Sequence, residues 1–176
     1  MANREALREL QARLASRLQA ARAEGVQASW LAVESGGRKF LLPLAQSGEI
    51  FPYSSTLPVP YTRSWFLGVA NLRGGLFGVV DLASFVGGQA PAQRTDASHA
   101  ESRLVALNSA LEINCALLVD RLAGLRNMDA FSTSSPPPDG APDFFGTGYT
   151  DSNGAFWQEL NLQALAQQPQ FLSISA

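Results

Sequence analysis

The chain has 176 residues, a net charge of −2 at pH 7 and a sequence pI near 5.4. This length is enough for one domain, or for two small barrels that share a core. Nucleic-acid-binding domains carry a basic patch, so the acidic balance argues against that class of function. Only 16% of the residues are charged, which suggests a surface covered in part by partners or by loops rich in Ser, Gly and Gln.

Several features predict a cytoplasmic protein. The first ten residues carry charges where a signal peptide needs an apolar stretch, and no run of about 18 apolar residues could span a membrane. The single cysteine, Cys115, lies in an apolar run and is expected to be a small buried hydrophobic side chain. One cysteine allows no disulfide within the chain, which fits a reducing compartment.

Residues 4–24 are predicted to form an amphipathic helix, with Asn3 as its N-cap and Gly25 after its end. One apolar stripe follows from spacings of three and four between Leu7, Leu10, Leu14, Leu18 and Ala21. The stripe has two interpretations. We favour docking on the protein's own core, and the alternative is a helix-in-groove or coiled-coil contact with a partner.

The rest of the chain is predicted to be mostly β, because short apolar runs alternate with Gly, Pro, Asn and Asp. The expected strands cover residues 30–33, 40–42, 48–53, 69–72, 76–80, 103–107, 111–119, 122–128, 146–150, 155–160 and 171–174. Short helices are expected at 82–85 and 162–166. Residues 87–100 are polar and predict a flexible connector.

An internal repeat supports two similar halves. Residues 68–85 align with residues 148–165 at a displacement of 80 without a gap, and residues 31–44 align with 104–117 at a displacement of 73. Each half then holds about five short strands, enough to close a small barrel and remove its edges. The predicted units are a helix over 1–27 and a domain over 28–176, with a first half at 28–88 and a second half at 101–176.

The stretch from Gly68 to Phe85 contains a β-hairpin that presents one guanidinium. Arg73 lies at the turn, and the adjacent Gly74 and Gly75 are expected to supply the positive φ values of a tight hairpin. Asp81 follows the second strand and is expected to cap the next short helix. Nothing near the turn would activate a nucleophile, so the hairpin is interpreted as a presentation device.

A proline-rich segment precedes this hairpin. Pro58 and Pro60 lack backbone donors and cannot join a ladder centrally, so the segment is expected to be an extended loop. It carries Leu57, Val59 and Tyr61, which either cap a barrel end, the interpretation we favour, or face a partner.

Catalytic chemistry is not visible in the sequence. His99 is the single histidine and lies in the polar connector, where no neighbour is expected to orient it as a general base. One His and one Cys cannot form a zinc site, and a strand rather than a helix follows Gly74 and Gly75, which excludes a phosphate loop. No catalytic residue, metal or cofactor is predicted. Two alternative hypotheses are a β-barrel module that binds nucleic acid and a hydrolase that depends on His99.

With the hairpin and the repeat in place, the chain resembles the CheW-like family of chemotaxis coupling proteins. The likeness lies in LPVP at 57–60, GVANLRG at 68–74, VVDL at 79–82, CALLVD at 115–120 and LNL at 160–162, and it extends over about 29–165. The resemblance implies two five-stranded SH3-like β-barrels that share a hydrophobic core. It also implies a non-enzymatic adaptor that joins a CheA-type histidine kinase to the cytoplasmic tip of a methyl-accepting receptor.

The resemblance also implies where partners bind. The receptor-facing region corresponds to Arg73 with Asn71 and Gly74, and an acidic position linked to receptor contact corresponds to Glu49. The kinase is expected at apolar barrel ends whose residues are not assigned individually. The N-terminal helix resembles the PilI-type branch of the family, which serves type IV pilus twitching motility, and flagellar chemotaxis is the alternative.

Overall fold

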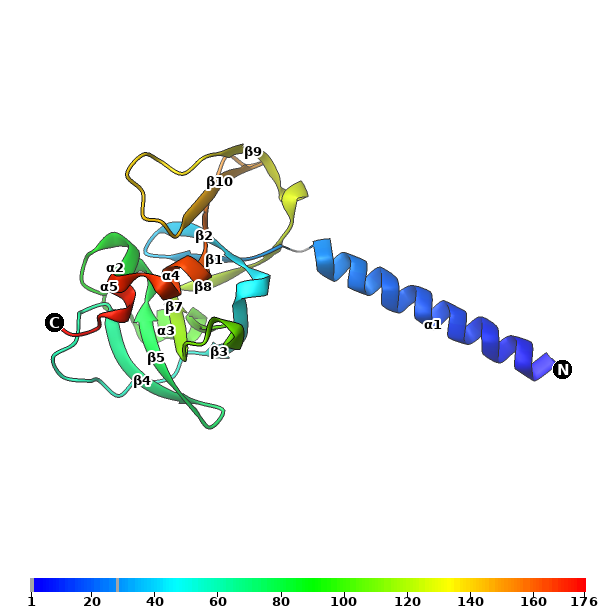
Figure 1. The fold of residues 1–176 in the computed structure, drawn as a ribbon, viewed down its shortest axis with the longest axis horizontal. Helices are drawn as coiled ribbons and strands as arrows, with labels where there is room; N and C mark the ends of the chain where they lie inside the picture. The colour runs from blue at the N-terminus through cyan, green and yellow to red at the C-terminus, as the bar shows by residue number, and fades with distance from the viewer. Residues whose placement is uncertain (1, 28) are drawn as a thin grey trace.

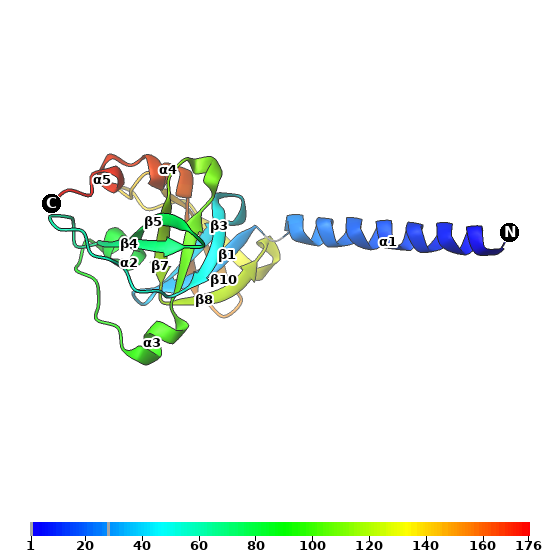
Figure 2. The same ribbon diagram turned by 90° about the horizontal axis from the view of Figure 1, so that it is seen from below.

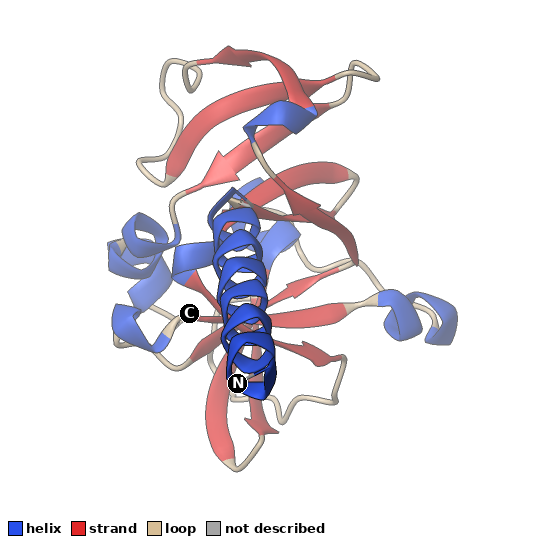
Figure 3. Ribbon diagram, turned by 90° about the vertical axis from the view of Figure 1, so that its right-hand side faces the viewer, coloured by secondary structure: helices blue, strands red, loops and turns tan. Residues whose placement is uncertain are grey.

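The computed structural model describes residues 2–27 and 29–176, and the fold is mostly β, as predicted (Figure 1). Its strands form two groups, which are separated in the view along the long helix (Figure 3). The six-stranded sheet has the order β8 (Arg121–Arg126), β1 (Trp30–Ser35), β2 (Arg38–Pro43), β11 (Phe156–Leu160), β10 (Phe145–Asp151), β9 (Phe131–Ser135). The five-stranded sheet has the order β3 (Ser47–Pro52), β6 (Arg103–Leu107), β7 (Cys115–Val119), β5 (Gly75–Asp81), β4 (Phe66–Leu72).

Each sheet combines strands from both halves of the sequence. The five-stranded sheet takes β3, β4 and β5 from the first half and β6 and β7 from the second, whereas β1 and β2 join the six-stranded sheet. The joins are two parallel pairs, β5 with β7 and β2 with β11. The expectation that each half closes its own barrel is therefore wrong. Parallel pairs connect strands that are distant in sequence, so local patterns do not reveal them. The two SH3-like subdomains remain open sheets.

The repeat is present in the structure as a correspondence between subdomains. The order β3-β6-β7-β5-β4 in one sheet matches β8-β1-β2-β11-β10 in the other. The displacement of 80 holds at the helix starts, because Asp81 accepts a hydrogen bond from Ser84 N and Asn161 accepts one from Ala164 N. These two residues cap α2 (Leu82–Gly87) and α4 (Leu162–Gln167), and the expected capping role of Asp81 is confirmed.

The displacement of 73 for the earlier strands is wrong. In the parallel pairs, Gly78 lies opposite Cys115 and Gln158 lies opposite Phe40. Because Gly78 and Gln158 are equivalent, Phe40 corresponds to Cys115, a displacement of 115 − 40 = 75. Both strands are filled with apolar residues. A shift of two residues in the alignment therefore still places apolar residues opposite one another, and the sequence does not distinguish the two registers.

The main core lies between the two sheets and is closed by α2, α4 and α5 (Pro169–Leu172). Strand β7 is buried along its whole length, which explains its uninterrupted apolar run, because a strand covered on both faces needs no polar alternation. The residues of this core include Leu31, Val33, Phe40, Leu42, Val80, Leu82, Val105, Leu117, Leu165 and Phe171. A smaller cluster fills each subdomain.

The N-terminal helix α1 (Ala2–Gln27) projects away from the sheets and ends beside the start of β1 (Figure 1). It is longer than predicted and continues through Asn3 and Gly25, which were expected to lie outside it. Side chains 4–17 are all exposed, so the favoured interpretation, docking on the protein's own core, is wrong for these residues. The core is already covered by the other helices. No helix among the described residues has the length and apolar character needed to cross a bilayer.

Two other segments differ from expectation. The predicted closing strand at 171–174 is wrong, because Pro169 starts α5, which runs through Phe171. The polar segment 87–100 contains most of a short helix, α3 (Asp96–Glu101), which lies on the opposite side of the domain from α4 and α5 (Figure 2). The three remaining helical turns are 3-10 segments at Leu44–Gln46, Ser109–Leu111 and Met128–Ala130.

Candidate functional site

The β4–β5 hairpin presents Arg73 on a two-residue turn. Leu72 pairs with Gly75, and the residues between them, Arg73 and Gly74, have φ values of 50° and 79°. Two positive φ values in succession are typical of a type I′ turn, which matches the twist of its strands. The expectation that Gly74 and Gly75 share the positive φ values is wrong, because Gly75 belongs to the ladder. The Asn71 side chain accepts a hydrogen bond from Gly74 N at 2.9 Å and braces the turn.

The structure brings Arg73 and Glu49 together. Arg73 Nη1 lies 2.7 Å from Glu49 Oε1, and the two side chains are 76% and 43% exposed. Glu49 is on β3 and Arg73 follows β4, and these are the two edge strands of the five-stranded sheet. The ion pair therefore spans the open side of this subdomain. An exposed pair of this kind contributes about 0–1 kcal/mol to stability, so its two charges can change partners at little cost.

A groove of about 450 Å³ runs beside this ion pair. Its apolar residues include Phe51, Leu72, Phe77 and Ile113, and its polar residues include Glu49, Arg73, Asn108 and Asn114. The rings of Phe51 and Phe77 lie 6.4 Å apart between centroids. Sequence analysis missed this groove, because part of it comes from the β6–β7 connection, which is far from the hairpin in the chain. All four residues implied by the resemblance (Asn71, Arg73, Gly74 and Glu49) lie at or next to it.

The proline-rich loop is open to solvent. Leu57, Val59 and Tyr61 are 70%, 37% and 90% exposed, so the favoured interpretation, that they cap a barrel end, is wrong. Leu57 pairs with β4 by two backbone hydrogen bonds to Val69, of 2.8 and 3.0 Å. This close approach requires glycine at position 68, where an added Cβ would lie 2.1 Å from Leu57 O. The alternative interpretation, that this loop faces a partner, stays a prediction.

A buried ion cluster, which sequence analysis did not predict, anchors the segment 87–100. Arg94 contacts Asp81 and Asp120 at 2.8 Å each, and the Arg94 side chain is only 10% exposed. Burial lowers the pKa of Arg94, but the hydrogen bonds that Arg94 donates to Asp81 and Asp120 outweigh it and raise the pKa above its ordinary value. Asp120 also accepts a hydrogen bond from Gly36 N at 2.8 Å in the β1–β2 turn, so the cluster links both sheets. The only available sequence signal was an aspartate after each of two buried strands.

The single histidine is more ordered than expected. The His99 ring stacks on Tyr53 at 4.2 Å between centroids, with 10° between the planes, so the expectation of an unoriented imidazole is wrong. Over residues 2–27 and 29–176, no cluster of three or more His, Cys, Asp or Glu side chains is arranged to hold a metal ion. Cys115 is buried, as predicted, and burial raises the pKa of its thiol to about 12.

Comparisons with known proteins agree with this architecture. The chain matches the CheW-like domain family over residues 29–170. It is 31% identical to Protein PilI of Pseudomonas aeruginosa over 161 residues, which cover 88% of this chain and 85% of that protein. Among solved structures it is similar to the scaffolding protein TtCheW from Thermoanaerobacter tengcongensis. That match has a TM-score of 0.65 and 16% identity, and it covers 82% of this chain and 95% of the other.

Proposed function

The chain belongs to the CheW-like family of chemotaxis scaffold proteins, and from that membership we propose that it is a non-enzymatic adaptor that couples a methyl-accepting receptor to a CheA-type histidine kinase. The observation that carries the proposal is the exposed Arg73–Glu49 pair beside an apolar groove. Such a surface suits a protein partner, because apolar contact area and exchangeable charges lie side by side.

Arg73 is well placed for binding a helical partner. Its guanidinium has five N–H donors, and with 76% of the side chain exposed most of them face solvent. A carboxylate on a receptor helix could accept two of these hydrogen bonds in a bidentate contact. The braced turn holds the backbone of Arg73 in place, so less conformational entropy is lost on binding.

Glu49 supplies the opposite charge at the same site. When a partner carboxylate takes the Arg73 guanidinium, Glu49 becomes available for a basic residue of the partner. The adjoining apolar residues Phe51 and Phe77 can accommodate an aliphatic side chain. The loop residues Leu57, Val59 and Tyr61 form a second exposed apolar surface and are proposed to face a partner as well.

Charge reversal at the turn tests the proposal. We expect Arg73→Glu to weaken binding of a receptor cytoplasmic fragment at least tenfold, because like charges then meet across the contact, and to leave binding of the kinase unchanged. Calorimetric titration of the full chain with each partner measures both affinities. The matched control is Asn153→Glu, which alters the equivalent turn of the other sheet and is expected to bind the receptor normally.

The exchange variant Arg73→Glu with Glu49→Arg separates binding from folding. It restores an ion pair between the two edge strands but reverses the charges that a receptor meets, so stability should return while receptor binding stays weak. Receptor affinity equal to that of the unaltered protein in Arg73→Glu would refute the site. If the unaltered protein binds neither partner at tens of micromolar, the adaptor function itself is refuted.

We further propose that the signalling array controls type IV pilus twitching. The support is the similarity to Protein PilI over most of both chains. Deletion of the gene should abolish surface twitching and leave flagellar swimming unchanged, and re-expression of the chain should restore twitching. The opposite pattern, with swimming lost and twitching retained, would assign the protein to flagellar chemotaxis.

A further inference from the structure

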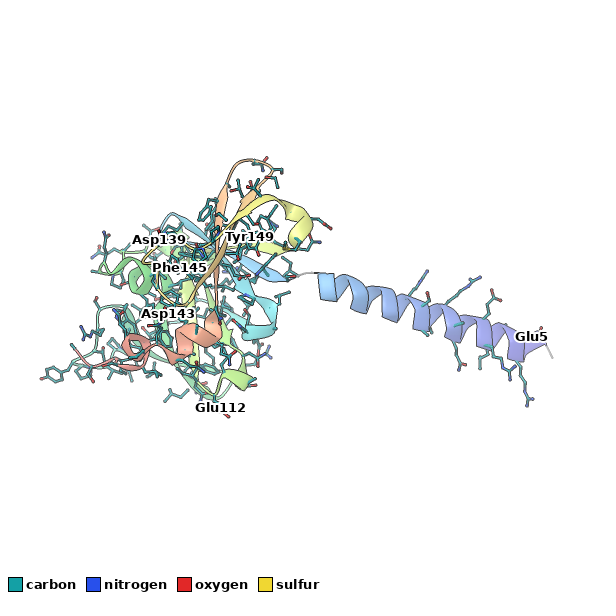
Figure 4. The ribbon with its side chains drawn as sticks, turned by 45° about the horizontal axis from the view of Figure 1, so that its top comes forward. Glu5, Glu112, Asp139, Asp143, Phe145 and Tyr149 are labelled. Atoms are coloured by element: carbon teal, nitrogen blue, oxygen red, sulfur yellow. The ribbon has the colours of Figure 1, made fainter. Side chains whose placement is uncertain are left out.

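Helix α1 carries an apolar stripe that no other described part of the chain covers. Leu7, Leu10 and Leu14 are 59%, 57% and 53% exposed. The side chains drawn on this helix stand clear of the domain, and those of residues 4–17 are all exposed (Figure 4). With 26 residues the helix is about 39 Å long, at 1.5 Å per residue. Helices in proteins gain most of their stability from packing of an apolar face, so this stripe is expected to have an external partner.

Basic side chains flank the stripe on both edges. Arg4, Arg13 and Arg17 each lie three positions from a leucine of the stripe, which places them beside it on a helix with 3.6 residues per turn. Glu5 lies on the opposite face of the helix. Glu9 also lies away from the stripe and pairs with Arg13 at 2.8 Å, and the Arg13 side chain is 74% exposed within this pair. Over residues 4–17, the surface offered to a partner is therefore leucine with an arginine rim.

This charge pattern discriminates among possible occupants. A second copy of α1 would bring one arginine rim against another, and such like-charge contacts disfavour pairing. A membrane surface is also disfavoured, because helices that lie in the interface combine a wide apolar face with aromatic residues, whereas this stripe is narrow and no residue of α1 is aromatic. A partner helix with carboxylates along the edges of its apolar stripe would pair directly with these arginines.

We infer that α1 is a docking helix for an amphipathic helix of another protein whose apolar stripe is rimmed by carboxylates. The leucines supply the contact area, and the arginines supply selectivity against basic partners. This surface is separate from the groove at Arg73, so the inference stands whether or not that groove binds a receptor.

A designed acidic helix tests the inference directly. The probe is a fluorescent synthetic peptide with the sequence of residues 2–27 in which all five arginines are replaced by glutamate, and the control peptide has the unaltered sequence. We expect fluorescence anisotropy to show that the full chain binds the acidic peptide with micromolar affinity that weakens as salt is added. The unaltered peptide should bind at least tenfold more weakly.

Matched variants locate the contact on the helix. Leu10→Asp removes a leucine from the stripe and should weaken binding at least tenfold, whereas Ser16→Asp adds the same charge on the far face and should weaken it less than threefold. Arg13→Glu with Arg17→Glu keeps the leucines and should also weaken binding at least tenfold. Circular dichroism of each full-length variant confirms that the helix is retained.

Several results would overturn the inference. Failure of the full chain to bind the acidic peptide would do so, as would equal weakening by Leu10→Asp and Ser16→Asp. A dimer in sedimentation experiments that Leu10→Asp abolishes would assign the stripe to a second copy. Binding to phosphatidylglycerol vesicles that depends on Leu10, without binding to the acidic peptide, would assign it to a membrane.

Discussion

Replacing Arg94 with Met tests whether the polar segment 87–100 is held by a buried ion cluster. The change leaves the Asp81 carboxylate, which is 1% exposed, without its cationic partner. Breaking a buried pair in this way costs about 3–5 kcal/mol. Asp120 is 42% exposed and loses about 0–1 kcal/mol, and Asp81 keeps its hydrogen bond from Ser84 N. We therefore expect the free energy of unfolding to fall by about 3 kcal/mol, and Tm to fall by about 6–12 °C.

Intrinsic fluorescence provides the assay for this loss of stability. The three tryptophans, Trp30, Trp65 and Trp157, are 5%, 6% and 3% exposed and will report unfolding through a shift in emission. Trp65 packs in the core between the sheets, and the other two lie in the cluster within the six-stranded sheet. Urea titration at constant pH gives the free energy of unfolding, and coincident transitions at all wavelengths would support two-state analysis.

A double variant separates the buried charge from the general effect of substitution. Asp81→Asn together with Arg94→Met removes both charges, and the Asn oxygen can still accept from Ser84 N, so stability should exceed that of Arg94→Met alone. Arg121→Met is the matched control, because it breaks a surface ion pair with Glu34 and should cost less than about 1 kcal/mol. If Arg94→Met costs no more than this control, or if the double variant is the least stable, the buried pair does not hold the segment.

Three further predictions follow from local environments. Gly68→Ala should destabilise the fold by more than about 3 kcal/mol in urea titration, because its Cβ would lie 2.1 Å from Leu57 O at a φ of 130°. Glu34 has a pKa below its ordinary value of 4.5, mainly because Lys39 donates a hydrogen bond to it. The stability that the ionised Glu34 side chain provides is therefore complete above its unfolded pKa and is lost as pH falls through its lower folded pKa. Because Gln cannot ionise, Glu34→Gln should flatten the decline in the free energy of unfolding below about pH 4.5. Cys115, with its thiol pKa raised to about 12 by burial, should react with a disulfide reagent only when the protein unfolds.

Each of these predictions has a clear control. Gly74→Ala places a Cβ in open space at a φ of 79° and should cost only about 1–2 kcal/mol, so an equal cost at both glycines would contradict the close-contact argument. If the free energy of unfolding of Glu34→Gln falls with decreasing pH as steeply as that of the unaltered protein, the ion pair between Glu34 and Lys39 is not a source of acid sensitivity. Rapid labelling of Cys115 in the native protein, faster than global unfolding, would show that the core at β7 opens locally.

Only part of the candidate site could be predicted from sequence. The tip of the β4–β5 hairpin was recognisable because its turn chemistry lies within a few residues, and Asn71 braces Gly74 locally. Family resemblance linked both Glu49 and Arg73 to receptor contact, but it did not predict that they form an ion pair, since they lie 24 positions apart with the proline-rich loop between them. The anchoring role of Arg94 had no signal near Arg94 itself, because its two carboxylate partners follow different strands that are distant in the chain.

The sequence by itself determined the elements whose causes are local. Periodic apolar residues, turn glycines and capping side chains specified most strands, the short helices α2 and α4, and the displacement of 80 between the two hairpins. Only the tertiary structure decided that strands of the two halves interleave, that edge strands β3 and β4 flank a groove, and that α1 projects away from the core. The physical reason is that strand pairing and burial depend on contacts between segments that are distant in the chain. The free energy of these contacts decides between alternative pairings, and the pattern of neighbouring residues does not reveal it.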